Sequence, residues 1–467
     1  MKVAFVTNYE KTIYFHGIAT RLVAVGHEVS WISPSNLWAR WLADHGVSSD
    51  AILDISRAGP EWQTPVTETD RAELAALEAA SGLRVTNVIL MDRILRDRPA
   101  TYVMRYFAVA RRLLADFLAA RDIAIVFAEQ TFGIELVANM VCAQQNRVLL
   151  APHVVRIPTG RMGFFRGHDQ STLVTRTPTS AQRAEAAAFL ESYRRDRPRP
   201  DYFTKQDRPP APSSSWPGKL VRHIRTSLSD PFDETHFSPS WLVRKRTSEV
   251  TNAFANRVLD RLWVPPPVPE RPFVLFPLHR QPEATVDVQA PRYSNQLELV
   301  KTLARTLPAT HELYVKEHPN GLGDRPPSVL REYAEIPSVR LVDPRVSTFA
   351  LVDAAALTIT ISGTAAFEAA LLGKPAVTIA PMFFGSVLLA NNYSPYSGSV
   401  ADLLAMTSRV TDADRVNLLA TLIASSFLGA MNNPNFAPEV LDAANLDAVA
   451  RGYSDLLDGE SWRTPRS

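Results

Sequence analysis

YVKEHPNG (Tyr314–Gly321) and TITISGTAAFEAALLGKP (Thr358–Pro375) are the two stretches that decide the fold of this chain. Each begins with apolar and β-branched residues typical of a strand and then changes abruptly to polar residues. In the second stretch, SGT (Ser362–Thr364) leads directly into an alanine-rich helix that ends near Gly373. The first backbone N–H groups of a helix have no partner within the helix, so a strand, a small-residue turn and a helix together predict a phosphate site.

Charged residues accompany this predicted site. Lys316 and His318 end the first strand, and we expect them to supply positive charge and a second hydrogen-bond donor for a diphosphate or phosphodiester. Glu368 follows Thr364 by four residues and therefore shares its side of the helix, where a carboxylate can accept hydrogen bonds from ribose hydroxyls. The alternative is that Ser362 and Thr364 only cap the helix, as these residue types commonly do, and that His318 is a structural turn histidine.

Apolar strands alternate with helices along most of the chain, which predicts parallel sheets covered by helices on both faces. The expected strands are residues 3–7, 28–33, 124–128, 148–151, 273–278, 312–315, 338–342, 357–361 and 376–379. The expected helices include residues 17–25, 102–120, 296–307, 348–355 and 364–372. The fold class is therefore α/β, with Rossmann-like domains.

Proline-rich segments mark the expected domain boundaries. VPPPVPERP (residues 264–272) favours a stiff connection, which separates an N-terminal domain (residues 1–265) from a C-terminal domain (residues 266–431). Residues 432–467 form a polar tail that we expect to return to the N-terminal domain. The segment 194–218 is rich in Pro, Arg and Ser without periodicity, so we expect an inserted surface loop.

Composition narrows the class of protein. The chain has 467 residues, 46% hydrophobic and 21% charged, which is ordinary for a globular protein of about two to three domains. A net charge of +2 gives no reason to expect nucleic acid. Because the chain has a single cysteine, Cys142, it cannot form an intramolecular disulfide framework. The sequence contains no apolar run long enough to predict a membrane-spanning helix. We expect a cytoplasmic protein, for which a basic cluster (Arg222, His223, Arg225 and Arg244–Arg246) leaves peripheral contact with the inner membrane open.

The polar residues that follow the strands are the candidate site residues, because open parallel sheets bind ligands at the carboxyl ends of their strands. In the N-terminal half these are Asn8, His16, Glu129, His153 and Arg156; in the C-terminal half they include His279, Gln281 and Glu283. Glu129 is the candidate general base, since it would lie opposite the phosphate site. His16 and His153 are the next candidates for that role.

No metal site is expected. The sequence contains no HExxH motif, and its histidines lack the i, i+3 or i+4 spacing of metal ligands. Positive charge and the helix dipole would instead stabilise a departing nucleotide, and we expect no cofactor.

Five motifs in the second half, taken in order, resemble the capsule polysaccharide biosynthesis glycosyltransferase family, which includes bacterial transferases that use CMP-Kdo. They are PLHRQPEAT (residues 277–285), YSNQ (293–296), YVKEHP (314–319), LVDP (341–344) and ISGTAAFEAALLGKP (361–375). The resemblance is strong over residues 273–381 and weaker over residues 129–136 and 153–167. It implies the GT-B fold, in which two Rossmann-like domains face each other across a cleft.

This resemblance also implies roles. His318, Pro319 and the turn Ser362-Gly363-Thr364 would bind the donor phosphate, beside the Lys316 already expected there, and His318 is also a candidate catalytic residue. His279, Gln281 and Glu283 would line the donor sugar or base. The N-terminal domain would hold a glycan or lipid-linked acceptor near Glu129. CMP-, UDP- and GDP-linked donors remain open. So do two other functions: a nucleotide-sugar epimerase of the same fold, and a catalytically silent glycan- or nucleotide-binding protein.

Overall fold

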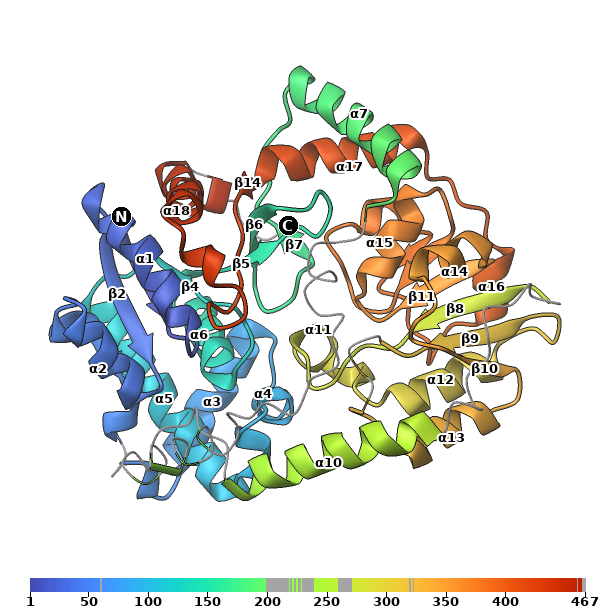
Figure 1. Ribbon diagram of the computed structural model, residues 1–467. Coiled ribbons are helices and arrows are strands. Elements are labelled where there is room, and N and C mark those ends of the chain that lie inside the picture. The colour runs from blue at the N-terminus through green and yellow to red at the C-terminus, as the bar shows by residue number, and fades with distance from the viewer. Residues whose placement is uncertain are drawn as a thin grey trace. The chain divides into compact units, whose positions relative to one another are not determined.

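The computed structural model describes residues 1–58, 61–198, 239–258, 271–318, 321, 323–459 and 461–463, together with residues 218, 221, 224, 225 and 228. The chain forms two compact units (Figure 1). Unit 1 consists of Met1–Arg176, Pro217–Pro239 and Ser425–Ser467, and unit 2 consists of Thr177–Trp216 and Ser240–Ala424.

Unit 1 is built on a mixed sheet with the strand order β14-β6-β5-β4-β1-β2-β3. The parallel strands are β1 (Lys2–Val6), β2 (Glu28–Ser33), β3 (Ile52–Asp54), β4 (Ile125–Phe127) and β5 (Val148–Val154). The antiparallel strands are β6 (Arg161–Arg166), β7 (Thr172–Leu173) and β14 (Phe427–Leu428). The strand order reverses between β1 and β4, so a crevice is expected outside their carboxyl ends.

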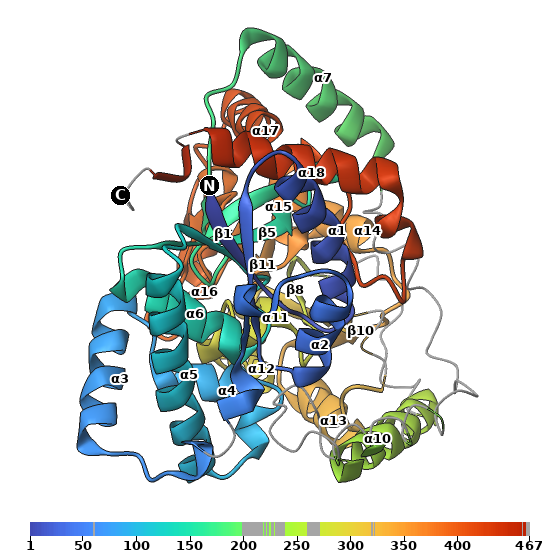
Figure 2. The same cartoon turned by 90° about the vertical axis from the view of Figure 1, so that its left-hand side faces the viewer.

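Helices cover both faces of this sheet, as Figure 2 shows. On one side lie α1 (Lys11–Ala24), α2 (Asn36–Asp44) and α18 (Ala443–Asp458); on the other lie α3 (Glu68–Ser81), α4 (Val85–Met91), α5 (Ala100–Ala120) and α6 (Gly133–Gln144). The buried ring of Tyr453 on α18 lies 4.8 Å from the rings of both Phe127 and Phe164. The C-terminal helix therefore completes the core of unit 1.

Unit 2 is built on a fully parallel sheet with the strand order β10-β9-β8-β11-β12-β13. The strands are β8 (Phe273–Pro277), β9 (Glu312–Lys316), β10 (Val339–Val342), β11 (Leu357–Thr360), β12 (Ala376–Thr378) and β13 (Ala390–Asn391). In chain order this is 3-2-1-4-5-6, the doubly wound Rossmann arrangement, whose switch point lies between β8 and β11.

The helices of unit 2 come from two parts of the chain. α11 (Ala284–Asp287), α12 (Gln296–Arg305), α13 (Pro327–Glu335), α14 (Thr348–Ala354), α15 (Thr364–Leu371), α16 (Val400–Ala405) and α17 (Asp412–Ser425) follow or connect the strands. α7 (Ser180–Asp196) and α10 (Pro239–Val258) precede them in the sequence. Arg194 on α7 pairs with Asp412 at 2.6 and 2.9 Å and donates to the carbonyl of Leu371 at 3.0 Å, which holds α7 in this unit.

The predicted α/β class with two Rossmann-like domains is confirmed, and the nine expected strands are found with bounds that differ by at most three residues. The sheet of unit 1 is nevertheless mixed rather than parallel, because β6, β7 and β14 add antiparallel strands to its edge. The unit boundaries also differ from those drawn on proline content: α7 and most of α10 belong to unit 2, and unit 1 resumes at Ser425 rather than at residue 432.

Two expectations fall largely outside the described residues: the connection at 264–272 and most of the insertion at 194–218. Of the basic cluster, Arg244–Arg246 lie on α10, where Lys245 and Arg246 approach Glu249 at 3.9 and 3.3 Å. Within the described part of the chain, no single helix has the length and apolarity to cross a membrane. Only α3 and α4 taken together pass that test, across an 82° bend.

The packing of α18 on β14 can be tested at Gly452. A Cβ atom there would lie 2.3 Å from Cγ of Phe427, a ring that also packs on Phe164. Gly452→Ala should lower the free energy of unfolding by about 1–2 kcal/mol, since overpacking typically costs more than the ~1 kcal/mol of helix propensity gained. Thermal and denaturant unfolding measure this, and adding Phe427→Leu should restore part of the loss. An increase in stability would contradict the tight packing.

Candidate functional site

The carboxyl ends of β8, β9 and β11 in unit 2 carry most of the predicted donor-site residues. Residues 279–283 follow β8, residues 316–318 end and follow β9, and residues 362–364 follow β11. These three segments, here called the β8–β11 edge, lie at the topological switch point of the sheet. The parallel register places them at one edge of the sheet, as the strand pattern predicts.

His279 is fixed at this edge through its backbone. The side-chain amide of Gln296 accepts from the N–H of His279 at 2.8 Å and donates to its carbonyl at 2.9 Å. A Cβ atom at Gly363 would lie 3.3 Å from Cε1 and 3.4 Å from Nε2 of the imidazole. The ring of His279 is therefore in close contact with the turn before α15, and this close approach is what favours glycine at position 363.

The N-terminus of α15 has no side-chain cap. Its N-cap residue is Gly363, whose own N–H donates to Oγ1 of Thr360 at 3.1 Å. Ser362 is fully buried and its hydroxyl donates to the carbonyl of Thr285 at 2.7 Å, so this serine ties α11 to the turn. Thr364 is the first residue of the helix and is half-buried. The turn thus does not cap the helix with a serine or threonine side chain at the N-cap, and a bound anion could take that place.

Glu368 lies one turn further along α15. Its side chain is only 5% exposed, and no described residue forms a hydrogen bond or ion pair with its carboxyl group. Burial raises the pKa of Glu368 from its ordinary value of 4.5 to about 7. A buried carboxyl group with no protein partner is unusual, because burial is unfavourable unless hydrogen bonds compensate. Ligand hydroxyl groups are suitable donors for it.

Lys316 does not present its charge at the edge. It is 2% exposed, and its ammonium group donates to the carbonyl of Pro344 at 3.1 Å and approaches that of Glu317 at 3.5 Å. Burial lowers the pKa of Lys316 to about 8. Its ammonium group therefore holds together the loops after β9 and β10 and is not directed to the edge as the sequence predicts.

His318 is half-buried beside these groups. Burial, followed by the charges of Lys316, Arg280 and Arg325, lowers its pKa to about 4. The imidazole is therefore neutral near pH 7, where it can donate one hydrogen bond and accept another but carries no positive charge. Pro319, which the sequence also assigns to the site, lies outside the described residues.

Gln281 and Glu283 shape the loop between β8 and α11. The Gln281 amide accepts from Nε2 of Gln296 at 2.7 Å and donates to Asp287 at 3.1 Å. The backbone N–H of Glu283 donates to the same carboxylate at 3.0 Å. Gln296 and Asp287 are thus structural members of the site that were not among the predicted residues, although Gln296 ends the YSNQ motif.

A buried ion pair lies within the loop after β9, and its arginine also contacts the loop after β8. Glu317, 1% exposed, pairs with Arg325 at 2.5 Å and accepts from the N–H of His318 at 2.8 Å. Arg325 also donates to the carbonyl of His279 at 2.5 Å. Neighbouring Arg280 pairs with Asp324 at 2.9 Å. Arg280, Asp324 and Arg325 were not among the predicted site residues, whereas Glu317 is one of the polar residues at the predicted end of β9.

In unit 1, Glu129 lies at the other switch point, directly after β4. One of its carboxylate oxygens pairs with the ammonium group of Lys11 at 2.5 Å, and the other accepts from the side-chain amide of Asn8 at 2.9 Å. Both partners follow β1, so the switch point itself brings the three groups together. Glu129 is 8% exposed, and its two oxygens are held in a fixed orientation.

Glu135 on α6 supports the loop that carries Glu129. Its buried carboxyl group accepts from the backbone N–H groups of Glu129, Thr131 and Phe132 and from the hydroxyl of Thr131. Burial and the charge of Glu129 raise the pKa of Glu135 to about 7. Within this loop Gln130 has a positive φ of 65°. Both polar atoms of its buried side chain lack a partner among the described residues.

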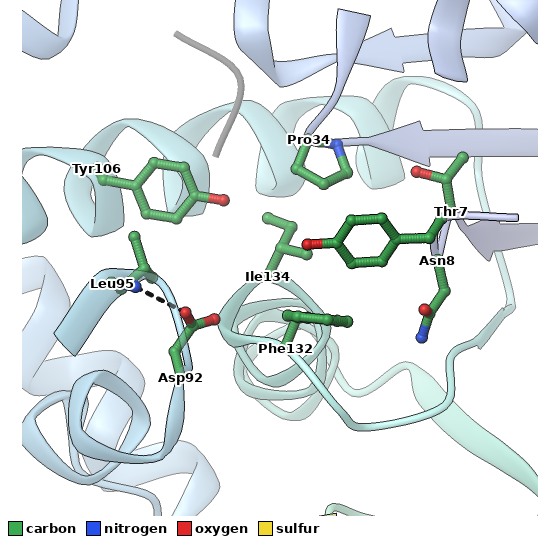
Figure 3. A pocket seen from close by; sticks show the side chains of 9 residues that line it. Thr7, Asn8, Pro34, Asp92, Leu95, Tyr106, Phe132 and Ile134 are labelled. Atoms are coloured by element: carbon green, nitrogen blue, oxygen red, sulfur yellow. Dashed lines mark hydrogen bonds between the residues drawn. The ribbon is translucent and has the colours of Figure 1, made fainter. Parts of the chain in front are cut away.

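A small cavity of about 20 Å³ lies beside this loop (Figure 3). It is lined by Thr7, Asn8, Tyr9, Pro34, Asp92, Leu95, Tyr106, Phe132 and Ile134. Asp92 accepts from the N–H groups of Ile94, Leu95 and Gly133, which fixes the start of α6. A volume of this size holds about one water molecule, so the cavity is too small for a sugar ring.

His16 and His153, the alternative candidates for the general base, are both packed among residues of the fold. His16 lies among the rings of Trp31, Trp41 and His45, at 6.3, 5.3 and 6.0 Å. His153 lies inside β5, opposite Gly163 of β6, rather than after a strand, because β5 extends to Val154. Burial lowers the pKa of His153 to about 4. Arg156 donates to the side chain of Gln170 at 2.6 Å. Among the described residues, no three His, Cys, Asp or Glu side chains are grouped to hold a metal ion.

Neither a protein-family model nor a curated protein matches this sequence. Among solved structures, the chain is similar to KpsC, a beta Kdo 2,7 transferase from Thermosulfurimonas dismutans, with 12% identity over 72% of this chain and 90% of that one (TM-score 0.33). It is also similar to UDP-GlcNAc 2-epimerase from Methanocaldococcus jannaschii, with 14% identity over 98% and 100% (TM-score 0.24). A third is the glycosyltransferase VinC in complex with dTDP, with 11% identity over 99% and 100% (TM-score 0.25). At these values the function has to be argued from the site itself.

Glu368→Gln tests the buried carboxyl group through pH. The carboxyl group of Glu368 binds its proton more tightly in the folded protein than in the unfolded chain. The contribution of this group to the free energy of unfolding is therefore complete below pH 4.5 and is lost as the pH rises to about 7. The variant lacks this loss. Its free energy of unfolding, relative to the parent, should therefore increase between pH 4.5 and 8, by at most ~3 kcal/mol.

Thermal unfolding of both proteins across this pH range measures the difference. Glu335→Gln, at an exposed position at the end of α13, provides the matched control. A difference between parent and Glu368→Gln that stays constant from pH 4.5 to 8 would contradict the raised pKa.

Proposed function

We propose that this protein is a glycosyltransferase that moves a sugar from a nucleotide-sugar donor to a hydroxyl group of a glycan or lipid-linked acceptor. In this proposal unit 2 binds the donor and unit 1 binds the acceptor, and the product belongs to a bacterial capsule or surface polysaccharide. The observation that supports it most is the β8–β11 edge, where the ring of His279 contacts the turn before α15 and the buried carboxyl group of Glu368 lies one turn along that helix. The sequence resemblance of residues 273–381 supports the same reading.

Each part of a nucleotide has a suitable counterpart at this edge. The N-terminus of α15, with Gly363 as its N-cap, suits the phosphate, because helix N-termini attract anions. Glu368 suits the ribose hydroxyl groups, whose hydrogen bonds would satisfy a carboxyl group that has no partner in the described part of the chain. The neutral imidazole of His318 is suited to donate a hydrogen bond to the departing phosphate. CMP-, UDP- and GDP-linked donors all contain these elements.

Transfer also requires a group that accepts the proton of the acceptor hydroxyl. As the sugar–phosphate bond breaks, the acceptor oxygen forms a bond to the anomeric carbon and its proton passes to a base. Glu129 is the carboxylate of unit 1 that supports this role, since Lys11 and Asn8 orient it and each carboxylate oxygen still has further lone-pair capacity. The phosphate leaves with the bonding electrons, stabilised by donors at the β8–β11 edge.

Incubation with a panel of CMP-, UDP- and GDP-linked sugars, with and without glycan and lipid-linked acceptors, tests this function. Release of free nucleotide that depends on an acceptor, together with a glycosylated product, is the expected result. A new sugar isomer formed without acceptor would instead identify an epimerase, and binding without any turnover would identify a silent binding protein. Either of these two results would overturn the proposed transfer.

Glu129→Gln tests the base. The amide keeps the shape and hydrogen bonding of the carboxylate but cannot accept the proton, so we expect the transfer rate to fall on the order of 10²-fold or more. Nucleotide affinity should stay within about threefold of the parent, since Glu129 belongs to unit 1. Steady-state kinetics and calorimetry measure the two effects. Glu10→Gln, on the loop after β1, is a matched control. A full transfer rate in Glu129→Gln would exclude Glu129 as the base.

A further inference from the structure

The β8–β11 edge needs a cation for a phosphate, and the described cations there differ in what their charged groups contact. The ammonium group of Lys316 is buried against two backbone carbonyls. The guanidinium group of Arg325 is buried between Glu317 and the carbonyl of His279. His318 is neutral near pH 7. Arg280 differs from all three, because its side chain is 45% exposed. It directly follows His279 in the sequence.

Among the residues that the structure describes, Arg280 forms a hydrogen bond through only one of its nitrogens. Its Nε donates to Oδ2 of Asp324 at 2.9 Å, and no described residue accepts from either of its terminal Nη groups. A guanidinium group has five N–H donors and Nε carries one of them, so the four donors on the two Nη groups remain available to a ligand. Two adjacent N–H donors in one plane match the geometry with which arginine binds phosphate.

Asp324 is itself held in place. Its backbone N–H donates to the carbonyl of Gly321 at 2.9 Å, and its carboxyl group is 14% exposed. Next to it, Arg325 binds Glu317 and the carbonyl of His279, which ties the loop that carries Asp324 to the loop that carries Arg280. The ion pair between Arg280 and Asp324 thus spans two loops that the hydrogen bond from Arg325 to the carbonyl of His279 already joins.

We propose that Arg280 is the phosphate-binding cation of the donor site and that Asp324 is a positioning residue, which holds Nε so that the two Nη groups remain directed to the phosphate. This inference rests on the proposed function. It assigns the charge of the site to Arg280, which follows β8 but was not among the candidate residues chosen from the sequence. The anion is bound as a bidentate hydrogen-bonded pair rather than through a lysine point charge.

Calorimetry with CMP, UDP and GDP, each compared with its nucleoside, tests this assignment. Arg280→Ala should weaken binding of the nucleotide that the parent binds by on the order of 10-fold or more, because charge-assisted bidentate hydrogen bonds are lost. Nucleoside affinity should change less than twofold. Arg280→Lys should restore only part of the affinity, since a lysine keeps the charge but not the two parallel donors.

Asp324→Asn tests positioning separately. It should weaken nucleotide binding several-fold without affecting the nucleoside, and combining it with Arg280→Ala should add nothing further, because Asp324 acts through Arg280. Arg340→Ala is the matched control: Arg340 is an exposed arginine on β10 that pairs with Glu312, which begins β9 at the opposite edge of the sheet. Its nucleotide affinity should equal that of the parent.

The outcomes separate this inference from the proposed function. If the parent binds nucleotides and Arg280→Ala binds them equally well, Arg280 is not the phosphate ligand, while the function stands. If nucleoside and nucleotide affinity fall together, Arg280 acts on the fold or the base and the assignment is wrong. Tighter binding by Asp324→Asn would overturn the positioning role. If the parent binds no nucleotide, both proposals fail.

Discussion

The constraint on which the rest depends is the reversal of strand order at the first strand of each sheet. Parallel strands need crossover connections, and connections that leave in opposite directions from two neighbouring strands leave the carboxyl ends of that pair uncovered. This happens between β8 and β11 in unit 2 and between β1 and β4 in unit 1. The polar groups at these two places are therefore next to each other in space although they are far apart in sequence: Glu129 is 121 residues from Asn8.

Burial at these two places has an electrostatic consequence. Glu368 and Glu135 are both carboxyl groups whose pKa is raised to about 7, but for different reasons. Glu135 accepts several hydrogen bonds from the loop around Glu129, and the nearby negative charge of Glu129 adds to the effect of burial. Glu368 has only burial. The first arrangement is typical of a group that supports a loop, whereas the second is what the proposed contact with ligand hydroxyl groups would require.

The sequence predicted the positions along the chain well and the directions of side chains poorly. The ends of β8, β9 and β11 were predictable because apolar runs there stop abruptly at polar residues, a local pattern. The direction of the Lys316 ammonium group depends on the carbonyl of Pro344, which belongs to the loop after β10. The place of α7 in unit 2 depends on ion pairs between Arg194 and Asp412, 218 residues apart. Strand β14 has only two residues and pairs with β6 through Phe427 opposite Met162, 265 residues apart. Such contacts leave no periodic signal in the sequence.

The return of the chain to unit 1 has a consequence for its synthesis. The core of unit 1 includes Phe427 on β14 and Tyr453 on α18, yet the sheet that these residues cover begins at Lys2. All of unit 2 lies between them in the chain. A ribosome that adds roughly 5–20 residues each second therefore holds the first sheet without its last strand and covering helix for tens of seconds. During that interval the aromatic face of β1 and β4 lacks part of its cover, while the parallel sheet of unit 2 can already be complete. Chaperone contact with the nascent chain would then concentrate on the N-terminal sheet, and unit 2 would fold first.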